Sequence, residues 1–465
     1  MVSRAASVTA AVGVLALASF GPVHFVSPAT ADPADQPGTS QSHPCSATWL
    51  HPESDVIPGE HLDYLGVRQA WRFATGEGQT VAIIDTGVAP HPRLPRLRGG
   101  GDLVGDFDGL QDCDAHGTLI AGLLAASEHA DGFAGVAPNA EIVSIRHSSG
   151  KFSSPAESRE EPGDDSPAGS GTVSSLARAI DAAANSGANV INISEVACVP
   201  NSTVLDDSAL SAAVHDAVLE RDIVIVAAAG NIEGTCANSN PPSPPPNDGS
   251  VVDPMDSIVT VASPAWYDDL VLTVGSVTLD GRPSDFSLPG PWVDVAAPGE
   301  ELASLSVAAT GETGPIPDLA TAVVTETDAM PIEGSSFSAP LVAGLAALLR
   351  ERFPALTAPQ IYERITRTAT GGGHGEDWRI GAGIIDPVAA LTAPSGSFRQ
   401  SAADPVPVSI DNGATDDERQ RTVGVTMAAL AATVLCVALG SALVNTAVSR
   451  PSTNRSRDAS ARIDR

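Results

Sequence analysis

Basic residues are scarce in this sequence. Its 465 residues include 25 Lys and Arg against 56 Asp and Glu, a formal net charge of −31, and the single lysine is Lys151. A surface that follows phosphates must be basic, so this balance argues against nucleic-acid binding. The sequence also lacks a loop whose acidic residues are spaced as metal ligands, and we therefore expect no metal site.

The N-terminus has the order of a secretory signal peptide. Arg4 precedes an apolar run at 12–18, and the small residues Ala29-Thr30-Ala31 follow. We place cleavage after Ala31. The apolar run is too short to span a bilayer, and a short buried helix is the alternative interpretation.

A long segment without charge lies near the C-terminus. Residues 422–448 carry no Asp, Glu, Lys or Arg, and about 20 such residues suffice to span a bilayer. Five arginines follow this segment and three acidic residues precede it, which predicts a cytoplasmic tail. We therefore expect a single-pass type I protein of the cell membrane, with the remaining domain outside the cytoplasm.

Cysteine is rare, and four of the five cysteines lie outside the predicted membrane helix, which contains Cys436. An even number in an exported domain favours disulfides. Three pairings are possible, and we favour the sequential one, which needs no crossing and joins Cys45 to Cys113 and Cys198 to Cys236. Free buried thiols are the alternative.

Between these ends, β-branched apolar runs alternate with helical stretches rich in small residues. The expected strands are 80–85, 141–146, 189–194, 222–230 and 270–277, and the expected helices are 118–128, 172–185, 208–220 and 339–352. Continuous apolar strands separated by helices predict an α/β fold, with a mainly parallel sheet covered by helices on both faces. The polar stretches 147–171 and 238–249 read as surface loops.

These observations divide the chain into six parts. The predicted parts are a signal peptide (1–31), an N-terminal extension (32–62), the folded domain (63–394), a linker (395–421), a transmembrane helix (422–448) and a cytoplasmic tail (449–465).

Three short motifs carry the groups of a nucleophilic site. IIDTGV puts Asp85 at the end of a strand, DAHGTLIAG puts His116 one residue before a helix, and GSSFSAP puts Ser336 at the start of another helix. Taken singly, each residue fits a turn or a helix cap. Together they predict a catalytic triad: a serine needs a histidine to accept its proton, and the histidine needs a carboxylate to orient it.

A fourth motif supplies an oxyanion site. In AAAGN, Asn231 directly follows an apolar strand, and its side-chain amide can donate to a developing oxyanion. The backbone N–H of Ser336 is the second expected donor.

The motifs IIDTGV, AHGTLIAG, AAAGN and GSSFSAPLVAG, in the order Asp, His, Asn, Ser, resemble those of subtilisin-like serine proteases. The likeness covers about 63–391. APHPRLP, GLQDCDAHGT, NISEVAC, PAWYDDLVLTVGSV and SDFSLPGPWVDVAAPG resemble the mycosins, membrane-anchored subtilases attached to type VII secretion systems. The resemblance implies a three-layer subtilisin-like fold, serine endopeptidase activity without a cofactor, and association with a type VII secretion membrane complex.

The same resemblance extends to residues around the site. Subtilases usually have Thr where Ser335 stands and often Ala where Ser338 stands, so we interpret both serines as capping or packing groups. It also implies that Ser194-Glu195-Val196 pairs with an extended peptide or protein substrate, and that Ala227-Ala228-Ala229 lines the first specificity pocket.

The N-terminal extension bears on activation. Classical subtilases carry a folded inhibitory prodomain, but about 30 residues are too few for an independent core. We expect a structural belt strapped beside His116 by a Cys45–Cys113 bridge. An alternative function is a scaffold that stabilises the secretion complex, with proteolysis secondary. A broad scavenging protease is disfavoured by the single-span anchor.

Overall fold

A mainly parallel sheet forms the centre of the molecule in the computed structural model, which describes residues 39–50, 55–153, 171–203, 207–244, 254–307, 318–324, 329–372 and 377–394. Within these ranges the strand order is β17-β18-β12-β11-β9-β7-β3-β5-β4. All neighbours are parallel except β17 and β18. The strands are β3 (Thr80–Asp85), β4 (Leu97–Asp102), β5 (Glu141–Arg146), β7 (Val190–Ile193), β9 (Val224–Ala228), β11 (Val271–Val277), β12 (Val295–Pro298), β17 (Thr370–Gly371) and β18 (Gly383–Ile384).

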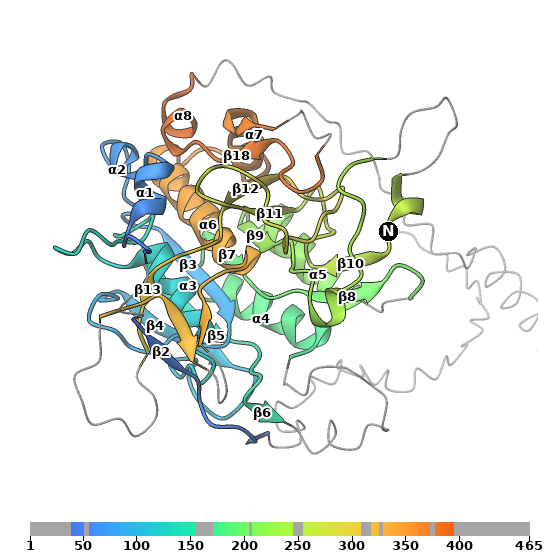
Figure 1. The fold of residues 1–465 in the computed structure, drawn as a ribbon, viewed down its shortest axis with the longest axis horizontal. Coiled ribbons are helices and arrows are strands. Elements are labelled where there is room, and N and C mark those ends of the chain that lie inside the picture. The colour runs from blue at the N-terminus through green and yellow to red at the C-terminus, as the bar shows by residue number, and fades with distance from the viewer. Residues whose placement is uncertain are drawn as a thin grey trace, which may run out of the picture. The chain divides into compact units, whose positions relative to one another are not determined.

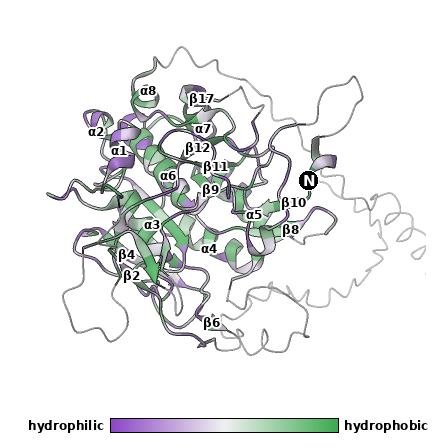
Figure 2. Cartoon of the chain, in the orientation of Figure 1, coloured by the Kyte–Doolittle hydropathy of each residue, from purple (hydrophilic) through white to green (hydrophobic). Residues whose placement is uncertain are grey.

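Helices cover both faces of this sheet. Every residue of β7, β9 and β11 is buried, and because successive strand residues point to opposite faces, both faces must be covered. Helices α3 (His116–Ala125) and α6 (Ser335–Arg352) pack against each other, and so do α4 (Val173–Asn185) and α5 (Ser208–His215); α3 and α4 both contact β3 (Figure 1). Figure 2 shows hydrophobic residues concentrated in the sheet and in α3 and α6. The expected layered α/β arrangement is confirmed.

The five predicted strands and four predicted helices are all present, but several boundaries differ. Helix α3 begins at His116 itself, and α6 begins at Ser335, four residues earlier than expected. Pro340 lies inside this helix. The expected helix 208–220 changes to a π-helix at Asp216–Glu220.

Short elements that were not predicted from the sequence complete the domain. They are α1 (Glu60–Tyr64), α2 (Val67–Ala70), α7 (Ala358–Thr368), α8 (Pro387–Thr392), β13 (Ser304–Leu305) with β14 (Leu319–Ala320), and β8 (Ala197–Pro200) with β10 (Thr260–Ser263). Leu62 of α1 and Val67 of α2 have no exposed surface. The domain core therefore begins slightly before the expected boundary at 63.

The described part of the N-terminal extension lies on this domain as two short strands. Strand β1 (Ser40–Gln41) pairs with β6 (Phe152–Ser153), and β2 (Ala47–Trp49) pairs with β15 (Ala322–Val324), which also pairs with β16 (Ala329–Pro331). Between them, Cys45 is bridged to Cys113 with an S–S distance of 2.02 Å. The extension is thus attached to the domain by two strand pairings and one disulfide, as expected for a structural belt. Its retention in the mature protein stays a prediction.

The terminal predictions fall outside the described residues. They concern the signal peptide, the linker, the transmembrane helix with Cys436 and the cytoplasmic tail; most of the 147–171 loop is likewise not described. Among the helices that the structure does describe, none has the length and apolar character needed to cross a membrane.

Candidate active site

Asp85, His116 and Ser336 meet at the carboxyl edge of the sheet. Asp85 is the last residue of β3, His116 the first of α3 and Ser336 the second of α6. His116 Nδ1 lies 2.7 Å from Asp85 Oδ1, and His116 Nε2 lies 3.0 Å from Ser336 Oγ. Asp85 is fully buried, whereas 26% of the His116 side chain is exposed. The three groups therefore form a hydrogen-bonded chain from a buried carboxylate to a hydroxyl.

Backbone geometry around Ser336 makes this approach possible. Gly334, directly before α6, has a φ of 149°, a region that side-chain-bearing residues rarely adopt. A Cβ at Gly334 would lie 3.0 Å from Ser336 Oγ and 3.1 Å from Asn231 Nδ2. Glycine thus keeps open the space where the hydroxyl and the asparagine amide face each other.

A second buried carboxylate supports Asp85 through Thr86. The Thr86 N–H donates to Asp85 Oδ1 at 2.8 Å, and the Thr86 hydroxyl lies 2.9 Å from Asp112 Oδ1. Asp112 Oδ2 accepts the N–H and the hydroxyl of Thr118 at 2.8 and 2.7 Å. These residues were not predicted from the sequence. Their position in the sequence could have indicated them, since Thr86 and Thr118 each stand within two residues of a predicted triad member.

Charge around His116 shifts its pKa upward. Burial is the largest single influence and lowers the pKa, but the charge and the hydrogen bond of the adjacent Asp85 carboxylate, together with the charges of Glu195 and Asp112, outweigh it, so that the pKa rises to about 9. For Asp112, burial raises the pKa to about 7, although hydrogen bonds from Thr118 and Thr86 act in the opposite direction. The imidazolium form is therefore stabilised in this site.

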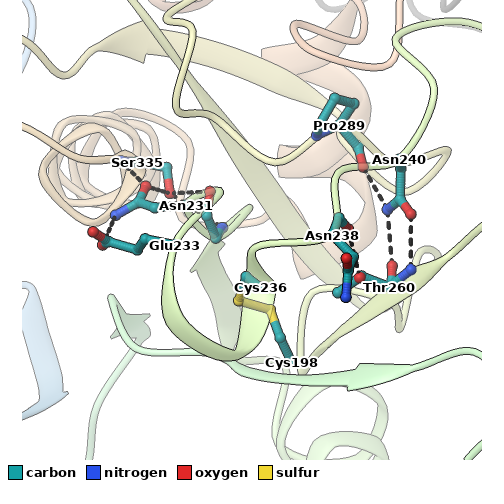
Figure 3. Close-up of a disulfide and its surroundings, with 10 residues drawn as sticks. Cys198, Asn231, Glu233, Cys236, Asn238, Asn240, Thr260, Pro289 and Ser335 are labelled. Carbon is teal, nitrogen blue, oxygen red and sulfur yellow. Dashed lines mark hydrogen bonds between the residues drawn. A yellow bond between two sulfur atoms is a disulfide. The ribbon is translucent and has the colours of Figure 1, made fainter.

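Asn231 lies beside Ser336, in the loop that follows β9 and three residues after that strand ends. Its Oδ1 accepts the N–H of Ser335 at 2.9 Å and the Ser335 hydroxyl at 3.0 Å, while its Nδ2 lies 3.4 Å from Glu233 Oε1 (Figure 3). The single proton of the Ser335 hydroxyl is shared between this Oδ1 and the carbonyl oxygen of Gly230, which also lies 3.0 Å from the hydroxyl. Ser335 therefore fixes the Asn231 carboxamide, so that its Nδ2 is left for other acceptors.

The sequence matches a family of known proteins. The family model described as the subtilase family matches residues 76–383. The chain belongs to the subtilase family. It is 48% identical to Mycosin-4 of Mycobacterium tuberculosis over 345 residues, covering 74% of this chain and 71% of that protein. This subtilase is thus a mycosin relative and a serine peptidase.

Solved structures extend the likeness to the fold. The crystal structure of MycP1 from the ESX-1 type VII secretion system matches with a TM-score of 0.71 and 43% identity, covering 78% of this chain and 93% of that one. A chain in the structure of an intact ESX-5 inner membrane complex matches with a TM-score of 0.68 and 37% identity, covering 91% of this chain and all of that one. The subtilisin-like fold is therefore shown.

The second disulfide of the subtilase domain lies beside the Asn231 loop. Cys198 of β8 is bridged to Cys236, the last residue of a short helical turn at Gly234–Cys236 (Figure 3). Residues 194–196 lead directly into β8, and the turn follows directly after Glu233. The bridge therefore joins the two chain segments that flank the expected substrate site, and both bridges have the pairing that the sequence favoured.

The predicted substrate segments differ in exposure. Ala227, Ala228 and Ala229 have no exposed surface, and Ser194 is 4% exposed, whereas Glu195 and Val196 are half-buried. The Glu195 carboxylate lies 3.5 Å from His147 Nδ1 and accepts the Ser148 hydroxyl. Solvent therefore reaches Glu195 and Val196 but not the three alanines. The role of the alanines in a specificity pocket stays a prediction.

Proposed function

We propose that this subtilase is a membrane-anchored serine endopeptidase that cleaves a peptide or protein substrate through the triad Ser336, His116 and Asp85. The carrying observation is the pair of hydrogen bonds that joins Asp85 to His116 and His116 to Ser336. A serine hydroxyl so placed can pass its proton to the imidazole while it attacks a carbonyl.

In this mechanism Ser336 Oγ attacks the peptide carbonyl and His116 Nε2 takes its proton. Asp85, bonded to Nδ1, holds the tautomer that leaves Nε2 free and stabilises the imidazolium that forms. Asn231 Nδ2 and the Ser336 N–H donate to the oxyanion. His116 then protonates the leaving amine, and a water molecule releases the acyl group by the same steps in reverse.

A second role as a scaffold is favoured by one comparison. The similar chain in the solved ESX-5 structure is part of an inner membrane complex. We propose that this subtilase associates with a type VII secretion complex, anchored by residues 422–448 as a single-pass type I protein with its catalytic domain outside the cytoplasm. A cell carrying a Ser336→Ala variant that still secretes normally would assign the role in secretion to assembly alone.

The test of the catalytic proposal is labelling of the full-length protein with a fluorophosphonate, which reacts with activated serines. We expect the wild type to be labelled and the Ser336→Ala variant not to be. Ser338→Ala is the matched control, because Ser338 is a buried serine two residues along the same helix. A folded wild type that stays unlabelled, or a Ser336→Ala variant that is labelled, would contradict the proposed triad.

A further inference from the structure

The backbone carbonyl of Ser336 lacks its normal partner within helix α6. In an α-helix this carbonyl would accept the N–H of the residue four positions later, which here is Pro340. Proline has no N–H, and its ring also pushes against the carbonyl four residues before it. Because Ser336 is buried, a carbonyl left without a partner would destabilise the turn that carries the nucleophile.

The Ser194 hydroxyl occupies the position of that missing donor. Ser194 Oγ lies 2.8 Å from the Ser336 carbonyl oxygen, and the contact is buried. Asn192 Nδ2 in turn donates to Ser194 Oγ at 2.9 Å. Ser194 is 4% exposed and Asn192 has no exposed surface, so water does not compete for these bonds.

The donor and acceptor roles in these two hydrogen bonds follow from the final acceptor, the Ser336 carbonyl. A carbonyl oxygen can only accept, so the single proton of the Ser194 hydroxyl must point at Ser336. The lone pairs of Ser194 then face Asn192, which has to present its N–H₂ side. Asn192 lies in β7 between Ile83 of β3 and Val226 of β9, so the chain links the nucleophile's backbone to the centre of the sheet.

We propose that Ser194 and Asn192 are positioning residues for the nucleophile, an inference that rests on the proposed function of Ser336. They hold the first turn of α6 against the edge of the sheet at which β3 ends with Asp85. The 3.0 Å contact between Ser336 Oγ and His116 Nε2 depends on that placement. The side chain of Ser194 therefore serves the enzyme rather than the substrate, and its predicted pairing with a peptide would use its backbone.

The experiment compares Ser194→Ala in two backgrounds of the full-length protein, wild type and Pro340→Ala. Alanine at 340 restores the N–H that the Ser336 carbonyl lacks, so it supplies within the helix the bond that Ser194 otherwise makes. The fluorophosphonate labelling rate is measured over a range of probe concentrations, which separates the maximal rate from probe binding. Ser338→Ala is the matched control, since its buried hydroxyl has no hydrogen-bond partner among the described residues.

With Pro340 present, we expect Ser194→Ala to lower the maximal labelling rate about 10-fold, with probe binding unchanged. In the Pro340→Ala background the same change should cost less than about 3-fold, the signature of two coupled groups. An equal loss in both backgrounds, or no loss in either, would overturn the inference.

The same experiment distinguishes failure of this inference from failure of the proposed function. If the proposed function is wrong, the wild type is not labelled at all. If Ser194→Ala does not fold, Ser194→Cys keeps a weaker donor of similar size. Its loss should again be larger with Pro340 present than in the Pro340→Ala background, and an equal loss would overturn the inference in the same way.

Discussion

The two flanks of Ser336 differ in how they hold their polar groups. On the His116 flank, Asp85 and Asp112 are buried and receive bonds of 2.7 to 2.9 Å from His116, Thr86 and Thr118. On the other flank, Asn231 is half-buried and its Nδ2 faces Glu233 at 3.4 Å.

This difference follows from what each flank would do in the proposed reaction. Groups that orient the imidazole and stabilise its cation must be fixed before the substrate arrives, and they act more strongly away from water. The oxyanion donor has to be reached by the substrate carbonyl, so it cannot be buried in the free enzyme. Each flank is also tied down by its own disulfide, Cys45–Cys113 or Cys198–Cys236.

The largest expected effect lies on the buried flank. Asp85→Asn keeps the size of the side chain but removes its charge and favours the wrong His116 tautomer, so we expect the rate of peptide hydrolysis to fall about 10⁴-fold. Steady-state kinetics of the full-length protein on a peptide substrate measure it. A loss below about tenfold would show that His116 does not depend on Asp85.

A smaller effect is expected on the open flank. Asn231→Ala removes one oxyanion donor and should lower kcat about 10²–10³-fold with little change in KM, since the donor acts on the transition state. The same assay measures this change. If KM rose while kcat stayed constant, Asn231 would be binding the substrate rather than the oxyanion.

The smallest expected effect is a shift in the pH dependence of the rate, which should differ between the two flanks. The proposed base must be neutral, so the rate should increase with pH until the His116 pKa, which the structure raises to about 9. The Asp112 carboxylate contributes to that increase in pKa. Asp112→Asn should therefore move the midpoint of the kcat/KM profile to lower pH.

Asn231→Ala is the control for this profile, because Asn231 carries no charge and should leave the midpoint in place. A midpoint that stays the same in Asp112→Asn, or that moves equally in both variants, would show that the two flanks do not differ in this way.

The motif residues could be predicted because their chemistry is local in sequence. Asp85, His116, Asn231 and Ser336 each stand at the junction of an apolar strand or a helix with a turn, and the parallel sheet brings such junctions to one edge. The starts of α3 and α6 were placed too late, because the helical pattern of apolar residues begins only after the first polar turn of each helix.

The supporting groups could not be predicted in the same way. Thr86 and Thr118 are common residue types, and their partner Asp112 acts through contacts that no periodicity encodes. Asn192 was visible as a polar residue inside an apolar strand, which signals a buried partner but does not name Ser194 or the Ser336 carbonyl.

The sequence by itself thus determined the fold class, the family resemblance, the four motif residues and the favoured cysteine pairing. These features can be predicted because they depend on the identity of single residues and on their spacing along the chain. Only the tertiary structure decided which hydroxyl serves which acceptor, that Ser335 orients Asn231, and that Ser194 replaces the N–H missing at Pro340. Those bonds join residues that lie 26, 104 and 142 positions apart in the chain, and a hydrogen bond depends on distances of a few tenths of an ångström that only the packed chain defines.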